Sequence, residues 1–461
     1  MPYAIDLFCG AGGMSEGLIQ AGFHILFSSD ISEDVENTYT HRHEQLGLHQ
    51  GHNTFFHRTD ISQLNGDFIF NSIQNLQIFQ GHEVPEIDAI FGGPPCQGFS
   101  LAGRRTRNDP RNMLFREYIR VIDEVQPKYV IMENVQGFLN TRLDGFVGVT
   151  EETYPEETLV TAILEGELTA IGYTVLPVQV LDASNFGVPQ RRKRAIFMAY
   201  RNDQTPIQYP DFTDTPREIV NVQDAISDLV LSQDQRYEIT NYQLNSIAGR
   251  TPRILRADRH GIEFGQPIEQ IGPFQNHEIA RHSLAVSQRF SLYREGENTT
   301  ALTLRILNEG IEDALFNYPD LLMECFNAQE EYEDLTSLAQ ALQNASASPS
   351  VVKIFTSKKG NRYRYDRNSP APTVLTLPDD FIVPFENRIP TVRELARLQS
   401  FDDSLLFRGK RTTGGPRRRV EVPQYTQVGN AVPPLLAKAV AQQVLVALRQ
   451  ENQNTMASTL V

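Results

Sequence analysis

The stretch that decides the fold is YAIDLFCGAGGMSEGLIQA, residues 3–21. Its first part, Tyr3–Phe8, is a short apolar run typical of a buried β-strand, and its last part, Gly13–Ala21, has the apolar spacing of an α-helix. Three glycines lie at the junction, where glycine permits a sharp turn and lets a ligand approach the backbone closely. The stretch therefore predicts a strand, a glycine turn and a helix, with a ligand site at the turn.

The pattern around this turn excludes two common nucleotide sites. The dinucleotide fingerprint G-x-G-x-x-G fails because Ser15 occupies the sixth position counted from Gly10, and the absence of GK[ST] excludes a phosphate-binding loop. Asp30 ends the next predicted strand, where a carboxylate can bind ribose hydroxyls, and Asp60 is a further acid at a predicted strand end. The residues predict an adenosine-containing ligand without a required pyrophosphate, or else a purely structural turn, and they disfavour a nicotinamide dehydrogenase.

Strand-like and helix-like segments continue to alternate up to about residue 200. Repeated β-α-β order predicts an open α/β sheet whose functional residues lie at the carboxyl ends of the strands. Ser32 is a plausible N-cap for the second helix. The further predicted strands are Ile25–Ser29, Ile87–Phe91, Tyr129–Met132, Val175–Val180 and Ala195–Tyr200, and the further predicted helices are Ser32–His43, Arg111–Val125 and Thr158–Ile171.

The middle of the chain has a different character. From about 201 to 385 the periodicity is weaker and polar loops are frequent, and within that range 306–350 holds nine acidic residues and no Lys or Arg. Helical patterning returns at Thr391–Ser400 and at Pro434–Leu448. We therefore expect a second, smaller and irregular unit between two parts of the α/β unit.

A cysteine follows the third predicted strand of the sheet. Phe91–Ser100 reads FGGPPCQGFS, so Cys96 lies between Pro-Pro and Gln-Gly rather than among aliphatic residues. A basic stretch with Arg104, Arg105 and Arg107 comes next. Nearby cations favour the thiolate, which is the nucleophilic form of cysteine. The loop therefore predicts a reactive Cys96 at the functional edge of the sheet.

A carboxylate follows the next strand. Tyr129–Val135 reads YVIMENV, which places Glu133 directly after an apolar strand and at the same sheet edge as Cys96. A partly desolvated glutamate there can hold a proton and act as an acid toward a ring nitrogen. A helix-capping or salt-bridging glutamate is the alternative for these residues taken alone.

Six motifs together resemble those of the cytosine-5 DNA methyltransferases, in the same order and at similar spacing. The resemblance covers about 1–200 and 390–445, which is well over half of the chain. The motifs are DLFCGAGGMSEGL (Asp6–Leu18), GGPPCQGFS (Gly92–Ser100), ENV (Glu133–Val135), QRRKR (Gln190–Arg194), RELARLQSF (Arg393–Phe401) and QVGNAVPP (Gln427–Pro434).

The resemblance implies an architecture. The fold would be α/β, with a large Rossmann-like domain of the S-adenosylmethionine-dependent methyltransferases and a smaller, irregular target-recognition domain. We expect 1–205 to form the catalytic and cofactor-binding domain and 206–424 to form the target-recognition domain. The remaining segment, 425–461, would return to the catalytic domain.

The resemblance also implies roles for single residues. Cys96 would be the nucleophile that adds to carbon 6 of a flipped cytosine, Glu133 the proton donor to N3, and Arg192 and Arg194 the arginines that steady the site. Asp30 stands where many members of the family carry glutamate, which changes reach but not role. The positions that match contacts to S-adenosylmethionine are Phe8, Gly10, Gly13, Asp30, Asp60, Ile61, Asn430 and Ala431.

The net charge of −15, from 57 acidic and 42 basic residues, argues at first against nucleic acid. Three short windows alter that conclusion: 104–116 carries five Arg and one Asp, 191–194 is RRKR, and 408–419 has six Lys or Arg and no acid. We expect a basic cleft for double-stranded DNA and an acidic exterior, including 306–350, that faces away from it. The residues expected to contact DNA are Arg104, Arg105, Arg107, Arg417, Arg418 and Arg419.

Composition limits the other possibilities. Three cysteines are too few for a disulfide framework, and no Cys/His spacing indicates a metal site. The N-terminus lacks the basic start of a signal peptide, and no apolar run is long enough for a membrane span, so we expect a cytoplasmic protein. We expect a monomer on DNA, with a possible cognate restriction endonuclease. An RNA cytosine-5 methyltransferase and a non-catalytic binding protein remain as alternatives, and the target sequence is not encoded in any readable way.

Overall fold

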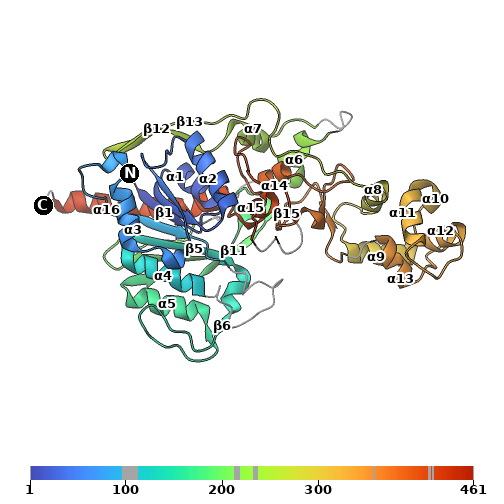
Figure 1. The fold of residues 1–461 in the computed structure, drawn as a ribbon, viewed down its shortest axis with the longest axis horizontal. Helices are drawn as coiled ribbons and strands as arrows, with labels where there is room; N and C mark the ends of the chain where they lie inside the picture. Colours follow the sequence, from blue (N-terminus) through green and yellow to red (C-terminus); the bar gives the residue numbers. More distant parts are fainter. Residues whose placement is uncertain are drawn as a thin grey trace.

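The computed structural model describes residues 2–95, 113–211, 219–231, 237–356, 359–413, 417 and 420–459, with side chains up to 451. A twisted sheet lies at one end of an elongated molecule, and a group of helices lies at the other end (Figure 1). We call the first part the sheet unit.

Eight described strands form the main sheet in the order β3-β2-β1-β4-β5-β11-β8, with β9 paired to β11. The first five strands in this order are parallel, and β11 runs antiparallel to β5. The chain order reverses between β1 and β4, and that switch point is where open α/β sheets place their sites. The strands are β1 (Tyr3–Leu7), β2 (His24–Asp30), β3 (Phe55–Arg58), β4 (Ala89–Gly92), β5 (Tyr129–Val135), β8 (Tyr173–Val175), β9 (Gln179–Asp182) and β11 (Lys193–Arg201).

Both faces of this sheet are covered, because its strands are apolar on both sides. In β5, Val130 and Met132 join one hydrophobic cluster, while Tyr129 and Ile131 join the other. Helices α3 (Gly66–Gln74), α4 (Leu114–Val125) and α5 (Val160–Ala170) pack on the first face, and α4 and α5 are drawn below the sheet in Figure 1. The second face is covered by α1 (Gly13–Ala21), α16 (Pro434–Thr459) and the hairpin β12 (Pro252–Asp258) and β13 (Gly261–Pro267).

The predicted sheet elements agree with the structure in type and differ mainly at their ends. Helix α1 has the predicted bounds, and α2 (Glu33–Gln45) begins after Ser32, whose hydroxyl accepts a hydrogen bond from the N–H of Val35 (3.4 Å). The predicted strand 175–180 was wrong as a single element, because β8 ends at Val175 and β9 begins at Gln179. The fold class, an α/β methyltransferase-like sheet with a second unit, is confirmed.

The C-terminal helix α16 closes the sheet unit by packing directly on α1. A Cβ atom placed on Gly17 would lie 2.5 Å from Cβ of Ala437, so the two helices touch backbone to backbone only because residue 17 is glycine. Among the described residues no single helix is long and apolar enough to cross a membrane; only α15 (Gln424–Asn430) and α16, taken together as a bent pair, meet such a criterion of length and composition.

A second unit is built around its own hydrophobic cluster, which includes Tyr365, Leu395, Phe401 and Val428. Its elements come from far apart in the sequence, and α14 and α15 lie between the sheet and the distal helices in Figure 1. It contains α6 (Val222–Ile226), α7 (Asn241–Ala248), α14 (Val392–Leu398), α15, β14 (Tyr363–Arg364), β15 (Ala371–Pro372) and β16 (Phe381–Ile382), while β10 (Gln190–Arg191) pairs with β15 and the small pair β6 (Arg142–Leu143) and β7 (Thr158–Leu159) lies outside it.

The distal helices form a separate lobe, residues 284–356, which we call the helical lobe. Leu302, Leu321, Leu338 and Val352 are buried in a cluster of their own. The expectation of irregular structure was wrong here: each helix is too short for its periodicity to stand out, but together they bury a shared core. The acidic range 306–350 lies in this lobe. Its helices are α8 (Leu284–Ser291), α9 (Thr299–Glu309), α10 (Ala314–Asn317), α11 (Pro319–Phe326), α12 (Leu335–Gln343) and α13 (Pro349–Thr356).

The packing divides the chain differently from the expected boundary at residue 206. Hairpin β12–β13 falls in the expected recognition range, yet Ile254 and Ala257 are buried with Leu18 of α1 and Ala439 of α16. The hairpin therefore belongs to the sheet unit. The sequence of its strands gave no sign of this, because their burial depends on a surface that distant segments provide.

Candidate active site

The ends of β1 and β4 meet at the switch point of the sheet, with Leu7 paired to Gly92. The glycine turn leaves β1 there, and the Pro-Pro-Cys loop leaves β4 there. Pro94 and Pro95 are described, whereas Cys96 lies outside the described residues. The switch point therefore brings together the two loops that the sequence singled out.

The glycine turn has a tightly specified backbone. Phe8, Gly10 and Gly12 all have positive φ (56°, 51° and 88°), a conformation that glycine adopts without strain and phenylalanine does not. A Cβ atom on Gly10 would have no atom within 4 Å. The turn thus presents open space beside its backbone, which suits a closely approaching ligand.

Asp30 fastens this turn to the end of β2. Its Oδ2 accepts a hydrogen bond from the N–H of Gly10 (3.1 Å), and its Oδ1 accepts one from the N–H of Ser32 (2.9 Å). Burial raises the pKa of Asp30, and the two N–H donors act in the opposite direction. Next to it, Ile31 is a large apolar side chain that is 66% exposed, a candidate contact that the sequence analysis did not single out.

The C-terminal segment supplies a second wall at the glycine turn. A Cβ atom on Gly13 would lie 2.2 Å from the carbonyl oxygen of Val432 and 3.3 Å from Cβ of Ala431. Only glycine fits at position 13. Ala431 is buried and Asn430 is exposed, so the segment expected to close the cofactor site does lie against the turn.

Asp60 and Ile61 lie at the next strand end. Asp60 caps a short helical turn, where its Oδ1 accepts from the N–H of Ser62 (2.9 Å), and the residue is exposed. Ile61 is buried in the sheet core, and its carbonyl accepts from Arg120 (2.9 Å). Asp60 thus offers a carboxylate at this edge, whereas the side chain of Ile61 packs inward.

A buried polar network supports the turn from below. The Ser15 hydroxyl donates to Asp6, and the hydroxyl of Tyr39 lies 2.8 Å from Ser15 Oγ and 2.6 Å from Ser28 Oγ. Burial raises the pKa of Asp6 to about 7, with the Ser15 hydrogen bond opposing the rise. Ser15 is the residue that breaks the dinucleotide fingerprint, and its hydroxyl explains why glycine would not serve there. Burial also raises the pKa of the nearby Cys9 thiol well above its usual value, in line with an inert cysteine.

Glu133 and Arg194 form an ion pair at the same sheet edge. Arg194 Nε lies 2.6 Å from Glu133 Oε1, and both side chains are about nine-tenths buried. The pair follows from the antiparallel register, in which Ile196 faces Glu133 and Arg194 faces Val135, so the two charged residues are diagonal neighbours. The sequence predicted each residue, but not their direct contact.

Asn134 ties this strand to the cysteine loop. Its Nδ2 donates to the carbonyl of Pro94 (3.1 Å), and its Oδ1 accepts from the N–H of Val135 (2.9 Å). A Cβ atom on Gly93 would lie 3.4 Å from Glu133 Oε2. Gly93 and Pro94, which precede Cys96 in the sequence, are therefore held beside Glu133 by an amide that the sequence analysis quoted within ENV but gave no role.

Arg192, expected with Arg194 to steady the site, has a different environment from Arg194. Its guanidinium is fully buried and donates to the carbonyls of Val374 (3.2 Å) and Gly429 (2.9 Å). These contacts join the strand of Arg194 to α15. In the described part of the chain Arg192 is a link between segments.

A pair of buried glutamines strengthens the same junction. Gln190 Nε2 donates to Gln399 Oε1 (2.9 Å), and its Oε1 accepts from the N–H of Val374 (2.7 Å). Gln399 Nε2 donates to the carbonyls of Val428 (2.8 Å) and Ala431 (3.4 Å). The pair forms a continuous path from β10, which precedes the strand of Arg194, to the segment against Gly13. Gln399 stands inside RELARLQSF, a signal that the sequence offered without indicating its partner.

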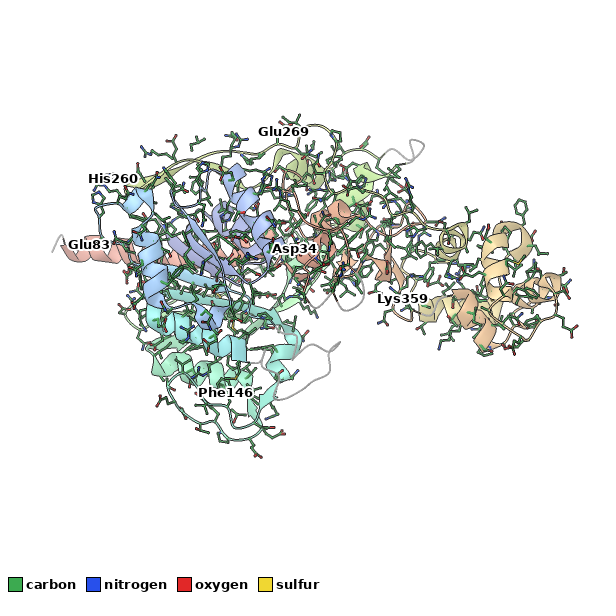
Figure 2. All side chains as sticks on the ribbon, in the orientation of Figure 1. Asp34, Glu83, Phe146, His260, Glu269 and Lys359 are labelled. Atoms are coloured by element: carbon green, nitrogen blue, oxygen red, sulfur yellow. The ribbon has the colours of Figure 1, made fainter. Side chains whose placement is uncertain are left out.

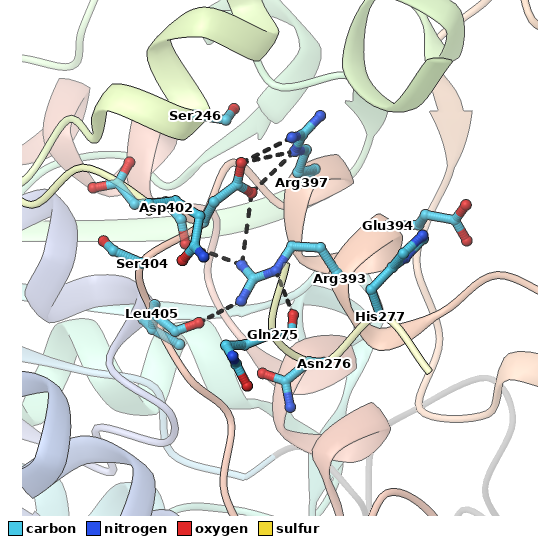
Figure 3. A network of polar contacts seen from close by, with 12 residues as sticks. Ser246, Gln275, Asn276, His277, Arg393, Glu394, Arg397, Asp402, Ser404 and Leu405 are labelled. Carbon is cyan, nitrogen blue, oxygen red and sulfur yellow. Dashed lines mark hydrogen bonds and ion pairs between the residues drawn. The ribbon is translucent and has the colours of Figure 1, made fainter. Parts of the chain in front are cut away.

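The second unit is locked onto the sheet unit by buried charges. Figure 3 shows Arg393 and Arg397 of α14 against the loop that follows this helix. Arg397 Nη2 lies 2.8 Å from Asp403, and Arg393 donates to the carbonyl of Asp402 (3.1 Å). The Asp402 carboxylate lies 3.5 Å from Arg42 of α2. Because these groups are paired away from water, the two units have a fixed mutual orientation.

Most of the arginines expected to contact DNA lie outside the described residues. Arg104, Arg105, Arg107, Arg418 and Arg419 lie outside the described residues, while Arg417 is described and exposed. Within the ranges that the structure describes, no group of three or more His, Cys, Asp or Glu side chains could hold a metal ion.

Comparisons with known proteins place this geometry in a family. The model of the C-5 cytosine-specific DNA methylase family matches residues 3–445. The Type II methyltransferase M.DdeI of Desulfomicrobium norvegicum is 29% identical over 446 residues, covering 95% of this chain and 88% of that protein. The Type II methyltransferase M1.HphI of Haemophilus parahaemolyticus is 31% identical over 444 residues, covering 96% and 86%.

A solved structure agrees at the level of the fold. A protein of E. coli, assigned as a DNA modification methyltransferase encoded within a prophage, superposes with a TM-score of 0.60 at 21% identity and covers 97% of this chain and all of that one. The family match spans the sheet unit, the second unit and the helical lobe alike. The chain therefore belongs to the C-5 cytosine-specific DNA methylase family and is a DNA (cytosine-5) methyltransferase.

Proposed function

We propose that the enzyme methylates carbon 5 of a flipped cytosine within a specific double-stranded DNA sequence, with S-adenosylmethionine as the methyl donor. The observation that carries this proposal is the Glu133–Arg194 pair of β5 and β11, beside Gly93, where the chain leaves the adjacent strand β4 toward Cys96. A protonated or hydrogen-bonding carboxyl group and a guanidinium are the groups needed at N3 and the carbonyl oxygen of a cytosine.

The residues at the glycine turn fit the proposed cofactor. Gly10 leaves open space beside the backbone, Gly13 admits Val432 as a second wall, and Asp30 offers a carboxylate for hydroxyl groups. Ile31 is exposed at the same strand end and suits the face of an adenine ring. When bound, S-adenosylmethionine supplies the methyl group that carbon 5 accepts. The residues proposed to hold it are Phe8, Gly10, Gly13, Asp30, Asp60, Ile61, Asn430 and Ala431.

The proposed chemistry of the chain begins with Cys96 and Glu133. Carbon 5 of cytosine is a poor nucleophile, and addition of the Cys96 thiolate to carbon 6 pushes the double-bond electrons toward carbon 5. Glu133 donates a proton to N3 and so stabilises the adduct. After methylation, loss of the carbon 5 proton returns the electrons to the ring and breaks the bond between sulfur and carbon 6.

The arginines have distinct proposed roles. Arg194 is held by Glu133 through Nε and by the carbonyl of Lys193 through Nη1 (2.8 Å), which fixes its guanidinium beside the base. We assign it the developing charge on the cytosine carbonyl oxygen. Arg192 acts as a positioning residue, because its buried bonds to Val374 and Gly429 hold the strand of Arg194 against α15.

We further propose that the range 206–424, without hairpin β12–β13, reads the target site. Flipping a base costs about a few kcal/mol of unpairing and unstacking, which contacts from this range must offset. The curated relatives are Type II methyltransferases, and we propose that this enzyme protects DNA as a monomer in a bacterial restriction-modification system, with a nuclease that reads the same site.

One experiment tests activity and target together. DNA from bacteria that express the chain is sequenced after bisulfite treatment, and the expected result is 5-methylcytosine at one short recurring sequence. Transfer of a labelled methyl group to tRNA instead of DNA would contradict the proposal. A Cys96→Ala variant is the matched control, because it removes the nucleophile and should form no covalent adduct with a duplex that contains 5-fluorocytosine.

A further inference from the structure

The basic segment, residues 408–419, is held at both of its ends by helix α2. At the near end the N–H of Arg408 donates to Thr38 Oγ1 (2.9 Å). Beyond the far end the N–H of Val422 donates to Asp34 Oδ2 (2.9 Å). Asp34 and Thr38 lie one turn apart on α2, so Arg408 and Val422 are held at neighbouring positions on that helix. Figure 2 labels Asp34 near the centre of the molecule, between the sheet unit and the helical lobe.

A buried side chain of α15 holds the same two positions. Gln427 Nε2 donates to the carbonyls of Arg408 (3.0 Å) and Val422 (3.0 Å), and its Oε1 accepts from Thr38 (2.7 Å). Both ends of the segment are thus held by directed hydrogen bonds from two helices. Such bonds specify a position more closely than apolar contact does.

Gly409 shows how closely Asp34 fits at the near end. Its φ is +86°, and a Cβ atom there would lie 2.9 Å from Asp34 Oδ1. One carboxylate oxygen therefore lies against Gly409 while the other accepts from Val422. Among the described residues, Asp34 and Gln427 each contact both ends of the basic segment.

Three of the four described cations of the segment are exposed, whereas Arg411 is half-buried and donates to the carbonyl of Glu278 (3.2 Å). Arg408, Lys410 and Arg417 reach solvent, and Lys410 forms an exposed pair with Glu421 (2.6 Å) that a phosphate can replace at little cost. Helix α2 begins three residues after Asp30. The anchored segment therefore carries these cations at the rim of the proposed cofactor site.

We propose that Asp34 is a positioning residue for binding of the DNA backbone, because it holds both ends of the basic segment where its cations can meet phosphates. The inference rests on the proposed function, since it needs DNA as the partner. An anchored loop loses less conformational freedom on binding than a free one, and that saving appears as affinity. Asp34 itself contributes the wrong charge for DNA, so its effect must be indirect.

Because Asp34 is negatively charged, the direction in which its replacement changes DNA affinity distinguishes the two possible roles. If Asp34 acted only through its charge, its removal would strengthen binding to a polyanion. If it acts as proposed, Asp34→Ala weakens binding by about 3- to 10-fold and makes the dependence of log Kd on log salt shallower by about one or two phosphate contacts. Asp34→Asn keeps an acceptor for Val422 and loses the charge, so it should bind as tightly as the unaltered enzyme or more tightly.

The measurement is fluorescence anisotropy with a labelled duplex of arbitrary sequence, titrated at several salt concentrations from about 50 to 200 mM. Glu33→Ala, on the same turn of α2, is the control for charge and should leave the slope unchanged. Gly409→Ala is a second test, which keeps the net charge. Because its Cβ displaces the near end of the segment from Asp34, it should flatten the salt dependence as Asp34→Ala does.

The outcomes separate this inference from the proposed function. Asp34→Ala and Gly409→Ala that bind duplex with an unchanged salt slope would overturn the inference, even in an enzyme that methylates DNA. Loss of slope in both variants, with unchanged binding of S-adenosylmethionine measured by calorimetry, supports it. If the unaltered enzyme transferred no methyl group to DNA, the proposed function would be wrong. The salt dependence of duplex binding would still decide the role of Asp34.

Discussion

Two Glu–Arg ion pairs in this enzyme have nearly the same distance and burial but lie in different units. In the sheet unit, Arg194 Nε lies 2.6 Å from Glu133. In the helical lobe, Arg305 of helix α9 has its Nε 2.8 Å from Glu297. The side chains of each pair are between 10% and 16% exposed. Distance and burial therefore do not distinguish a reactive pair from a structural one.

The surroundings of the two glutamates do distinguish them. Glu297 accepts two hydrogen bonds from Arg305 and another from the N–H of Arg294, so the carboxylate is saturated by its own lobe. Glu133 has Arg194 as its only ion-pair partner among the described residues and lies beside Gly93 at the switch point. A carboxylate at a strand end next to a glycine loop is available to a ligand, and a saturated one is not.

The largest expected effect comes from breaking the first pair. Glu133→Gln should lower kcat about 10²- to 10⁴-fold, because the amide cannot donate a proton as a carboxylic acid does. Glu297→Gln, the matched control, should keep activity and lose about 1–3 kcal/mol of unfolding free energy. Single-turnover methylation and denaturant unfolding give the two numbers. Equal losses of activity in both variants would mean that the pairs differ in nothing but location.

A smaller loss is expected at the cofactor-side wall. Gly13→Ala forces a Cβ against Val432 and should raise the Kd for S-adenosylmethionine about 10-fold, equivalent to about 1.4 kcal/mol. Gly261→Ala has open space around its Cβ and should leave the affinity unchanged. Isothermal titration calorimetry measures both. A Gly13→Ala protein with unaltered affinity would show that this wall does not shape the site.

The glutamine path should give a few-fold effect. Gln399→Met leaves the carbonyl of Val428 and the amide of Gln190 each with one bond fewer, a loss of about 1–3 kcal/mol in stability. We expect KM for S-adenosylmethionine to rise about 3-fold, equivalent to about 0.6 kcal/mol, with kcat nearly unchanged. A cycle with Gln190→Met should show coupling of about 0.5 kcal/mol or more. Strictly additive effects would break the proposed link between the two segments.

Stability should also depend on pH through the network below the glycine turn. The pKa of Asp6 is about 7 in the folded state against an ordinary value of 3.8, so between these limits the folded chain holds a proton that the unfolded chain lacks. Stability from this group is present at low pH and is lost as pH rises toward 7. The stability of Asp6→Asn relative to the unaltered enzyme should therefore increase from pH 4 to 7, by about 3 kcal/mol.

Denaturant unfolding at several pH values measures this difference, with exposed Asp67→Asn as the control. A constant gap between Asp6→Asn and the unaltered enzyme across that range would contradict the raised pKa of Asp6.

The sequence predicted the sheet unit well because local signals and packing agree there. Helix α1 has its predicted bounds, Ser32 caps α2, and Glu133 and Arg194 lie at one sheet edge. In this unit the strands are apolar on both faces, and the turns need particular residues. Each of these signals depends on only about ten neighbouring residues in the sequence.

Other features were out of reach because they depend on contacts between distant segments. Nothing local to Gln399 points to Gln190, which lies 209 positions away. Nothing in 252–267 indicates that Ile254 is buried under α16. Arg192 resembled Arg194 in sequence, yet it is buried against the carbonyls of Val374 and of Gly429 in α15. The helices of the lobe are short, so their shared core is visible only when they are assembled.

The contact between Gly13 and Val432 has a consequence for how the enzyme comes into being. A ribosome makes one of these residues near the start of the chain and the other near its end, and at roughly 5 to 20 residues per second the interval is about 20 to 80 seconds. During that time the glycine turn has only one of its two walls. Newly made chains should therefore gain the complete cofactor-side wall only after α16 has left the ribosome, so synthesis itself delays the first methylation.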